Sequence, residues 1–185
     1  MNNLEEILGK IKQLHVTKKT ILIAIDGFGG SGKTTLANKI KDSFSDATIV
    51  QLDDFYSHEL NRTDRARILE QVIKPLREER SARYQIYDWK NKKLTEWRDV
   101  KPGGIVIVEG VSMLHDDFND YWDLRIWVNY LQDEGIKRGI ERDKKEYGID
   151  STHEWVNIWM PQETEYVEMQ KPQQKADYII DGAKL

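Results

Sequence analysis

The sequence contains no cysteine among its 185 residues. Disulfide bonds, thiolate metal sites and cysteine nucleophiles are therefore excluded. No apolar run approaches the roughly 18 residues that a membrane span needs, and the first residues lack the basic start and apolar stretch of a secretory signal. We therefore expect a cytoplasmic protein without a membrane partner.

The sequence also lacks an excess of positive charge: Lys and Arg total 28 against 32 for Asp and Glu, which gives a formal net charge of -4. The overall field repels polyanions, so no nucleic-acid polymer is expected as a partner and any recognition of phosphate has to be local. Four histidines, His15, His58, His115 and His153, are scattered without the spacing of a ligand pair. A zinc site is therefore not expected.

Apolar runs of strand length alternate along the chain with segments that have helical periodicity. Strands are predicted at residues 20–26, 47–52, 103–110, 123–129 and 176–181, and helices at residues 33–44, 64–79 and 134–147. This alternation predicts an α/β fold with a mainly parallel sheet that is covered on both faces. With 39% hydrophobic and 32% charged residues, the chain is expected to form a single domain over residues 1–185.

Two further segments complete the prediction. Residues 1–19 carry leucine and isoleucine at three- and four-residue steps, which predicts an amphipathic helix with Asn3 as a candidate cap. Residues 82–103 are rich in aromatic residues and turn formers and have no helical stripe. They are expected to form a hairpin-like insertion.

The stretch GFGGSGKT, Gly27–Thr34, matches the phosphate-binding pattern G-x-x-x-x-G-K-[ST] at every fixed position. Its glycines allow successive N–H groups to turn inward at the start of a helix, where they form a nest for anions. A glycine-rich turn that binds nothing is the alternative, which the flanking strand and helix disfavour. We therefore expect ATP and Mg²⁺, with Lys33 reaching the β- and γ-phosphates and Thr34 serving the metal. The predicted binding residues are Gly27, Gly29, Gly30, Ser31, Gly32, Lys33, Thr34 and Thr35.

Carboxylates follow two of the predicted strands: Asp53 and Asp54 in LDDFY, and Glu109 in VIVEG. Because the carboxyl ends of parallel strands share one edge, Asp53 and Glu109 are expected near the triphosphate. A carboxylate there can hold the metal or accept the proton of an attacking hydroxyl. The alternative is that Asp53 and Asp54 cap a turn. Consecutive residues of an extended chain point to opposite sides, so the two aspartates are not expected to act as an equivalent pair.

The ordered set DGFGGSGKTT, DDFY, YDW, VIVEG and ADYIIDG resembles the uridine kinase family of P-loop kinases, in a wider group with phosphoribulokinase and pantothenate kinase. The resemblance implies a three-layer αβα P-loop NTPase fold with a mainly parallel five-stranded sheet. It also implies that the insertion at about residues 82–103 serves the acceptor and that a helical lid lies at about residues 138–150.

The resemblance further implies roles for particular residues. Asp53 would take the proton from a primary hydroxyl, and Glu109 would hold Mg²⁺ together with Thr34. Asp54 is then expected to shape the turn or to support neighbouring site residues, with a water-mediated metal role as the alternative. The residues implied for the acceptor site are Phe55, Tyr56, Asp64, Tyr87 and Asp88.

Cations that stabilise the transferring phosphoryl group are expected from the lid. Arg138 and Arg142 lie four residues apart and so share one helical face. The resemblance implies that Arg142 stabilises charge in the transition state and that Arg138 contacts the nucleotide, while an ordinary solvated helix face is the alternative.

Tryptophans offer a further candidate acceptor surface, made of Trp89, Trp97, Trp155 and Trp159. Trp155 and Trp159 are one helical turn apart, a spacing that is more typical of packing than of ligand binding.

The expected activity is transfer of the γ-phosphoryl group of Mg-ATP to a small-molecule acceptor, most directly the 5'-hydroxyl of a nucleoside such as uridine or cytidine. Two alternatives stay open. One is a kinase of the same fold for pantothenate, nicotinamide riboside, glycerate or a sugar phosphate, and the other is an ATP-binding regulator without acceptor chemistry. The sequence also leaves open whether the chain forms a homo-oligomer.

Overall fold

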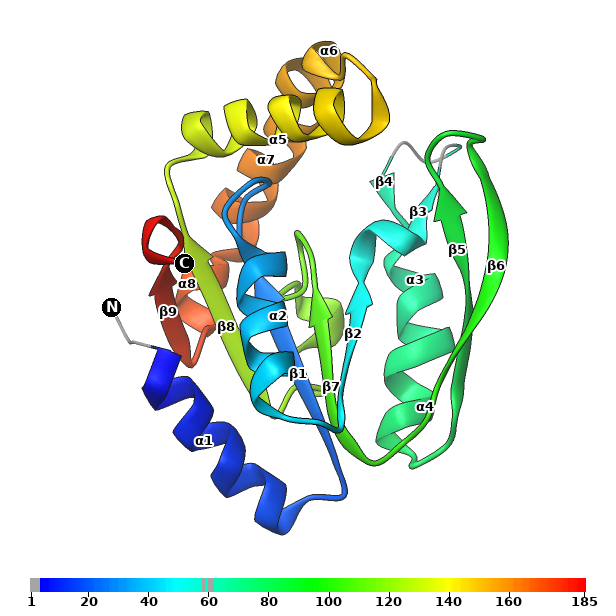
Figure 1. Cartoon of the computed structure of the whole chain (residues 1–185), viewed down its shortest axis with the longest axis vertical. Helices are drawn as coiled ribbons and strands as arrows, with labels where there is room; N and C mark the ends of the chain where they lie inside the picture. The colour runs from blue at the N-terminus through cyan, green and yellow to red at the C-terminus, as the bar shows by residue number, and fades with distance from the viewer. Residues whose placement is uncertain (1–3, 58, 60–61) are drawn as a thin grey trace.

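A five-stranded parallel sheet in the order β2-β7-β1-β8-β9 forms the centre of the computed structural model, which describes residues 4–57, 59 and 62–185 (Figure 1). All four neighbouring strand pairs run parallel. The strands are β1 (Thr20–Asp26), β2 (Ala47–Gln51), β7 (Gly104–Glu109), β8 (Leu124–Asn129) and β9 (Tyr178–Asp181). The α/β fold predicted from alternating periodicity is therefore confirmed. Asn3 and His58 lie outside the described residues.

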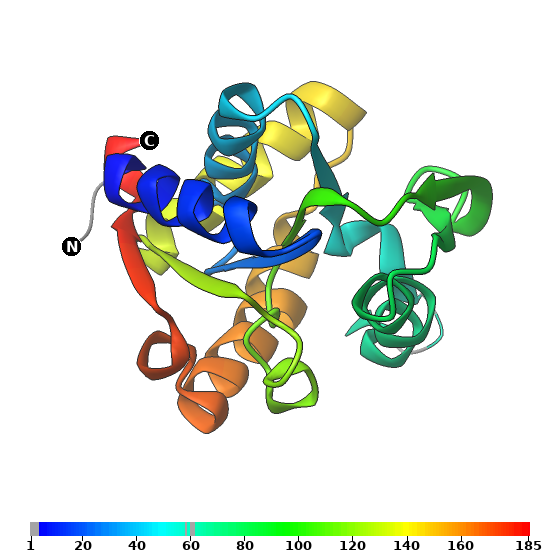
Figure 2. The same cartoon turned by 90° about the horizontal axis from the view of Figure 1, so that it is seen from below.

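Alternate side chains of β1 enter two hydrophobic cores on opposite faces of the sheet. Ile23 packs with helices α1 (Leu4–Thr17) and α2 (Lys33–Ser43), whereas its neighbour Leu22 packs in a second core. Figure 2 shows α1 and α2 on one side of the sheet and α7 on the other. A strand that is buried on both faces has to be apolar at successive positions, which explains the unbroken run that predicted β1.

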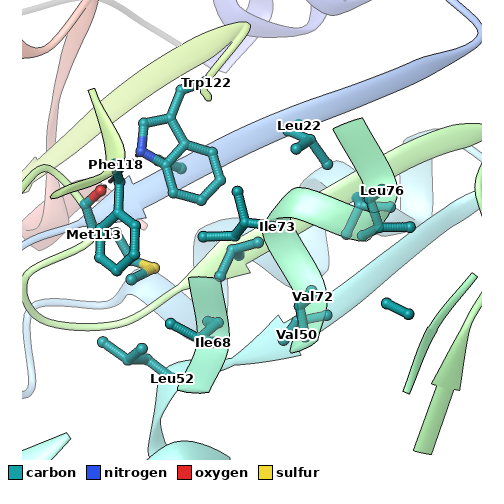
Figure 3. Packing of buried hydrophobic residues seen from close by; sticks show 14 of the residues in the cluster. Leu22, Val50, Leu52, Ile68, Val72, Ile73, Leu76, Met113, Phe118 and Trp122 are labelled. Carbon is teal, nitrogen blue, oxygen red and sulfur yellow. Dashed lines mark hydrogen bonds between the residues drawn. The ribbon is translucent and has the colours of Figure 1, made fainter. Parts of the chain in front are cut away.

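The second core lies between the sheet and a helical segment made of α3 (Arg65–Ile68), the π-helical turn η2 (Leu69–Ile73) and α4 (Lys74–Arg77). Figure 3 shows side chains of this segment gathered with residues of the sheet and of the loop after β7. The helix predicted at 64–79 is therefore present, with a wider turn inside it. Pro75 lies two residues after the end of that turn, and a proline cannot donate to the carbonyl four residues earlier.

The predicted insertion is an antiparallel hairpin of β5 (Ala82–Asp88) and β6 (Lys93–Val100), and it stands beside β2 (Figures 1 and 2). Tyr84 and Val100 anchor it in the second core. The hairpin extends to the edge of the sheet at which the parallel strands end (Figure 1).

Residues 132–170 form a set of helices at that same edge, which we call the lid (Figure 1). The lid consists of α5 (Gln132–Tyr147), α6 (Thr152–Glu154), the π-helical turn η4 (Trp155–Trp159) and α7 (Met160–Gln170). The helix predicted at 134–147 is confirmed, and the sequence pattern did not reveal the helices that follow it. The short α8 (Pro172–Lys175) leads from the lid into β9.

The remaining elements are short turns and strands near the sheet edge and at the end of the chain. They are η1 (Leu52–Phe55), β3 (Tyr56–Ser57), β4 (Arg62–Thr63), η3 (Asp116–Phe118) and η5 (Gly182–Lys184). No helix in the described part of the chain is long and apolar enough to span a membrane.

Candidate active site

The glycine-rich loop connects β1 to α2, as its sequence predicts. Gly30 has a φ of 70° and Gly32 a φ of 101°, a region of backbone conformation that favours glycine. A Cβ atom at Gly30 would also clash with the backbone of Gly135 in the lid. Backbone N–H groups of a glycine-rich loop at the start of a helix suit an anion.

Polar side chains of the loop are buried. Lys33 is only 8% exposed and donates a hydrogen bond from Nζ to the carbonyl oxygen of Phe28 at 2.9 Å. Oγ of Ser31 is buried, and among the described residues it has no hydrogen-bond partner. A buried hydroxyl without a partner, a buried ammonium and a nest of N–H groups all fit a phosphate ligand.

Glu109 lies at the end of β7, where its Oε1 accepts a hydrogen bond of 2.8 Å from the hydroxyl of Thr34. Burial raises the pKa of Glu109, the nearby Lys33 ammonium lowers it, and the negative charge of Asp53 raises it again. Two oxygen groups in contact suit Mg²⁺, which prefers oxygen ligands and takes its others from phosphates and water. No three His, Cys, Asp or Glu side chains of the described ranges form a group that could hold a metal ion.

Asp53 and Asp54 have different surroundings, although they are adjacent. Asp53 is exposed at the sheet edge, whereas Asp54 is 7% exposed, accepts a hydrogen bond from Tyr84 Oη at 3.2 Å and pairs with Arg98 at 3.4 Å. The surroundings of the two aspartates therefore differ, whereas their unequal action stays a prediction, and the extended chain from which it was argued was wrong. They lie in the 3-10 turn η1 and not on extended chain. Burial raises the pKa of Asp54, and its contacts hold the hairpin against η1.

Phe55 does not line the acceptor site, so this expectation was wrong. Its side chain is fully buried in the second core, with its ring centroid 4.7 Å from that of Tyr84. The 3-10 turn directs Phe55 inward, which the sequence pattern of alternating strand residues does not anticipate.

Tyr56 and Tyr87 belong to an aromatic cluster with Trp89 and Trp159. Ring centroids are 4.4 Å apart for Tyr56 and Trp89, 5.3 Å for Tyr56 and Tyr87, and 6.0 Å for Trp89 and Trp159. The cluster joins the hairpin to the lid, because Tyr87 lies in β5 and Trp159 lies in η4. Trp97, by contrast, is 51% exposed on β6.

Asp64 and Asp88 both organise local backbone. Asp64 caps α3 by accepting a hydrogen bond of 3.1 Å from the backbone N–H of Arg67. Asp88 accepts hydrogen bonds of 2.9 Å from the backbone N–H groups of Lys90 and Asn91, and the side-chain amide of Asn91 lowers its pKa. Their predicted part in acceptor binding is untested and stays a prediction.

The two lid arginines lie on the exposed side of α5. Arg142 donates from Nε and from a terminal nitrogen to Oδ1 of Asp143, at 3.1 and 2.9 Å. The guanidinium of Arg138 lies 4.2 Å above the ring of Tyr130. Their predicted action on the nucleotide stays a prediction.

The lid packs directly on the glycine-rich loop through Trp155 and through Glu163, Gly135 and Gly139, which sequence reasoning missed. The backbone N–H of Gly29 donates a hydrogen bond of 3.0 Å to Oε2 of Glu163, which is 9% exposed. A Cβ atom at Gly29 would clash with the ring of Trp155, and one at Gly139 would clash with the same ring. Burial raises the pKa of Glu163 to about 7, although the Lys33 ammonium opposes that shift.

One signal in the sequence points to this packing. Gly135 and Gly139 lie one helical turn apart in α5, where glycine lowers helix stability, and such a pair marks a close approach. Trp155 is 5% exposed, so the expectation that its spacing indicates packing is confirmed.

Asp26, the last residue of β1, holds the start of the glycine-rich loop in place. It is fully buried and accepts hydrogen bonds from the backbone N–H groups of Gly27, Ser112 and Leu114 at 2.7, 3.0 and 2.8 Å. The hydroxyl of Tyr166 donates a fourth hydrogen bond at 2.6 Å. Burial raises the pKa of Asp26, and its contacts tie β1, the loop after β7 and α7 together.

Comparison with known proteins gives a sequence match over most of the chain. The Phosphoribulokinase / Uridine kinase family matches residues 54–184. The uridine kinase of Clostridium novyi (strain NT) is 33% identical over 183 residues, which cover 88% of this chain and 87% of that protein.

Solved structures share the fold at lower sequence identity. A possible uridine kinase from Bacillus stearothermophilus has a TM-score of 0.70 at 18% identity, covering 95% of this chain and 100% of that one. D-glycerate 3-kinase from Cryptococcus neoformans has a TM-score of 0.61 at 13% identity, covering 98% of this chain and 96% of that one. At these identities the two structures establish a likeness of fold.

Proposed function

Since the chain belongs to the phosphoribulokinase and uridine kinase family and is a phosphotransferase acting on a hydroxyl group, we propose that it phosphorylates the 5'-hydroxyl of a nucleoside such as uridine or cytidine, using ATP. The similarity to the uridine kinase of Clostridium novyi supports this choice of acceptor.

The convergence of four groups at one edge of the sheet carries the proposal. Thr34 contacts Glu109, and the charges of Lys33 and Asp53 both act on the Glu109 carboxyl. A cation for phosphate, oxygen ligands for a metal and an exposed carboxylate for a proton therefore share one small region. Phosphoryl transfer needs these groups together.

In this proposal the oxygen of the acceptor hydroxyl forms a bond to the γ-phosphorus while the bond from that phosphorus to the bridging oxygen of ADP breaks. Asp53 receives the hydroxyl proton, and ADP leaves with the bonding electron pair. Lys33 balances the charge of the β- and γ-phosphates, and the N–H groups of the loop orient them. Arg138 and Arg142 would add positive charge after leaving Tyr130 and Asp143.

Thr34 and Glu109 would hold Mg²⁺, which neutralises charge on the phosphates when it is bound. Because Glu109 is buried beside Lys33, its carboxyl group is held in one place by the surrounding structure.

The aromatic cluster of Tyr56, Tyr87, Trp89 and Trp159 supports a flat acceptor such as a nucleobase, since planar rings stack on aromatic side chains. Asp64 and Asp88 are the proposed ligands of acceptor hydroxyl groups. The fold itself does not decide the acceptor, because a D-glycerate 3-kinase shares it. A single domain over residues 1–185 and a cytoplasmic location stay predictions, and formation of a homo-oligomer stays open.

The test is an ADP-release assay with Mg-ATP and a panel of uridine, cytidine, nicotinamide riboside, pantothenate and glycerate. We expect turnover with uridine or cytidine and formation of the 5'-monophosphate. The Asp53→Asn variant should lose about 10²–10⁴ in kcat, the usual contribution of a general base. Asp42→Asn changes an exposed aspartate of α2 and serves as the matched control.

Three results would contradict the proposal. If the activity of Asp53→Asn stays within about tenfold of that of the unmodified protein, Asp53 is not the general base. Slow ADP release that no added alcohol increases would instead favour a nucleotide-binding regulator. Turnover with pantothenate or glycerate alone would show that the acceptor is not uridine or cytidine.

A further inference from the structure

A carboxylate of the protein itself occupies part of the glycine-rich loop. Glu163 of α7 accepts the N–H of Gly29 at 3.0 Å, and this side chain is buried. The N–H groups of such a loop bind phosphate because they are oriented toward an anion. Here one of them already binds an anion that the lid supplies.

The charged groups that act on Glu163 include residues that are proposed to serve the triphosphate. The ammonium of Lys33 acts on it from α2, and the carboxyl groups of Asp53 and Asp26 act on it from η1 and β1. Lys33 of this motif reaches the β- and γ-phosphates. Asp53 is the proposed base on the acceptor side. The region between these two side chains is where an in-line transfer requires the γ-phosphoryl group.

The position of Glu163 is fixed by the packing of the lid. Tyr166, one turn later in α7, donates its hydrogen bond to Asp26, and the ring of Trp155 lies against Gly29. Gly135 of α5 approaches the carbonyl of Gly29 so closely that a Cβ atom would clash. Glu163 is therefore held against the loop by contacts on both sides of it.

We propose that Glu163 sets the relative affinity for ATP and ADP, because its carboxylate occupies the position that the terminal phosphate of ATP needs. ATP has to displace this side chain from Gly29, whereas ADP lacks the γ-phosphate and leaves the contact in place. Two anions in one buried site repel each other strongly. The inference rests on the proposed binding of nucleotide by the loop.

The proposal also predicts how the two affinities depend on pH. A protonated Glu163 carries no charge, so its opposition to the γ-phosphate weakens as the pH falls. Burial raises the pKa of Glu163 to about 7, which places the change near neutral pH. Lys33, Asp26 and Asp53 are the charged groups that act on the Glu163 carboxyl. A substitution of Glu163 leaves all three in place, so a change in pH dependence is assigned to Glu163.

The experiment measures dissociation constants of Mg-ATP and Mg-ADP by isothermal titration calorimetry, without an acceptor, at pH 6 and pH 8. The variant Glu163→Gln keeps the size of the side chain and an oxygen that can accept the N–H of Gly29. Glu165→Gln removes the same charge from an exposed position of α7 and is the matched control.

At pH 8 we expect Glu163→Gln to favour ATP over ADP at least about tenfold more than the unmodified protein does. A factor of ten corresponds to about 1.4 kcal/mol, less than the cost of opposing two like charges in a buried site. The unmodified protein should favour ATP more at pH 6 than at pH 8, and this pH dependence should be absent from Glu163→Gln and present in Glu165→Gln.

An unchanged ratio of affinities in Glu163→Gln, or the same pH dependence in both proteins, would overturn the inference and leave the proposed function intact. The pH profile of the unmodified protein is a second measurement that needs no variant, and a flat profile overturns the inference as well. If the unmodified protein binds neither Mg-ATP nor Mg-ADP, the proposed function and the inference fail together.

Discussion

The hydroxyl of Thr34 donates a hydrogen bond of 2.8 Å to Oε1 of Glu109, although 75 positions separate them in the chain. The contact joins the first turn of α2 to the last residue of β7. It exists because β1 and β7 are neighbouring parallel strands in register, with Ile25 opposite Glu109, so the elements that follow them begin at the same edge.

Glu109→Gln should lower kcat/KM by about 100-fold or more, because the side chain loses the charge with which it would hold Mg²⁺. The Mg²⁺ concentration that gives half-maximal rate should rise. Steady-state assays over a range of Mg²⁺ concentrations check both effects. Thr34→Ser keeps the hydroxyl and should retain most of the activity, and an unchanged Mg²⁺ requirement in Glu109→Gln would argue against a metal role.

Trp89→Ala should raise the KM of the proposed nucleoside acceptor about 5- to 150-fold, since stacking of a base on an aromatic ring contributes about 1–3 kcal/mol. The KM of ATP should change little, because the rings that Trp89 contacts, those of Tyr56, Tyr87 and Trp159, belong to the aromatic cluster and not to the glycine-rich loop. Steady-state kinetics with each substrate varied in turn separate the two constants.

Trp97→Ala is the matched control for that experiment, since Trp97 lies on the same hairpin with half of its surface exposed and contacts Arg83. Its kinetic constants should remain within about twofold, as for surface substitutions away from special features. Equal effects of the two alanine variants would show that the hairpin is merely destabilised.

Gly135→Ala should loosen the docking of the lid, because the new Cβ atom would clash with the carbonyl oxygen of Gly29. Hydrogen exchange of backbone amides in residues 132–170 should become faster, and this measurement needs no substrate. Gly9→Ala is the control, since nothing lies within 4 Å of a Cβ atom there. That variant should stabilise α1 by about 1 kcal/mol, the usual gain of alanine over glycine in an exposed helix. Exchange in the lid that is unchanged by Gly135→Ala would contradict the close packing.

Glu163→Gln should gain stability relative to the unmodified protein as the pH rises. Glu163 ionises near its ordinary value of 4.5 in the unfolded chain and near 7 in the folded one. Between these pH values the folded protein keeps a proton that the unfolded chain has released, so the free energy of unfolding falls as the pH increases. The loss is on the order of 3 kcal/mol at about 1.4 kcal/mol per pKa unit, and glutamine avoids it.

Urea denaturation at pH 5 and pH 8 measures this difference, with Glu165→Gln as the control of equal charge. A constant difference between Glu163→Gln and the unmodified protein at both pH values would show that Glu163 has the same pKa in the folded and unfolded chains.

The sequence predicted the five strands because each is buried on one or both faces and therefore forms a compact apolar run. It predicted the hairpin from turn formers and aromatic residues. It did not predict the helices of residues 152–170, because their buried side chains contact separate surfaces of the molecule and leave no regular apolar stripe. The 3-10 turn at Asp53 and Asp54 was also missed, and with it the buried position of Phe55.

The sequence by itself determined the phosphate-binding loop, the parallel sheet and the edge at which Asp53 and Glu109 meet, since these follow from local pattern and from the geometry of parallel strands. Only the tertiary structure decided that Trp159 reaches the hairpin and that Glu163 binds Gly29. Each of these contacts joins two segments that are far apart in the chain, and a periodic pattern within one segment does not indicate which distant segment it will contact. They form because the lid packs against the glycine-rich loop and the hairpin.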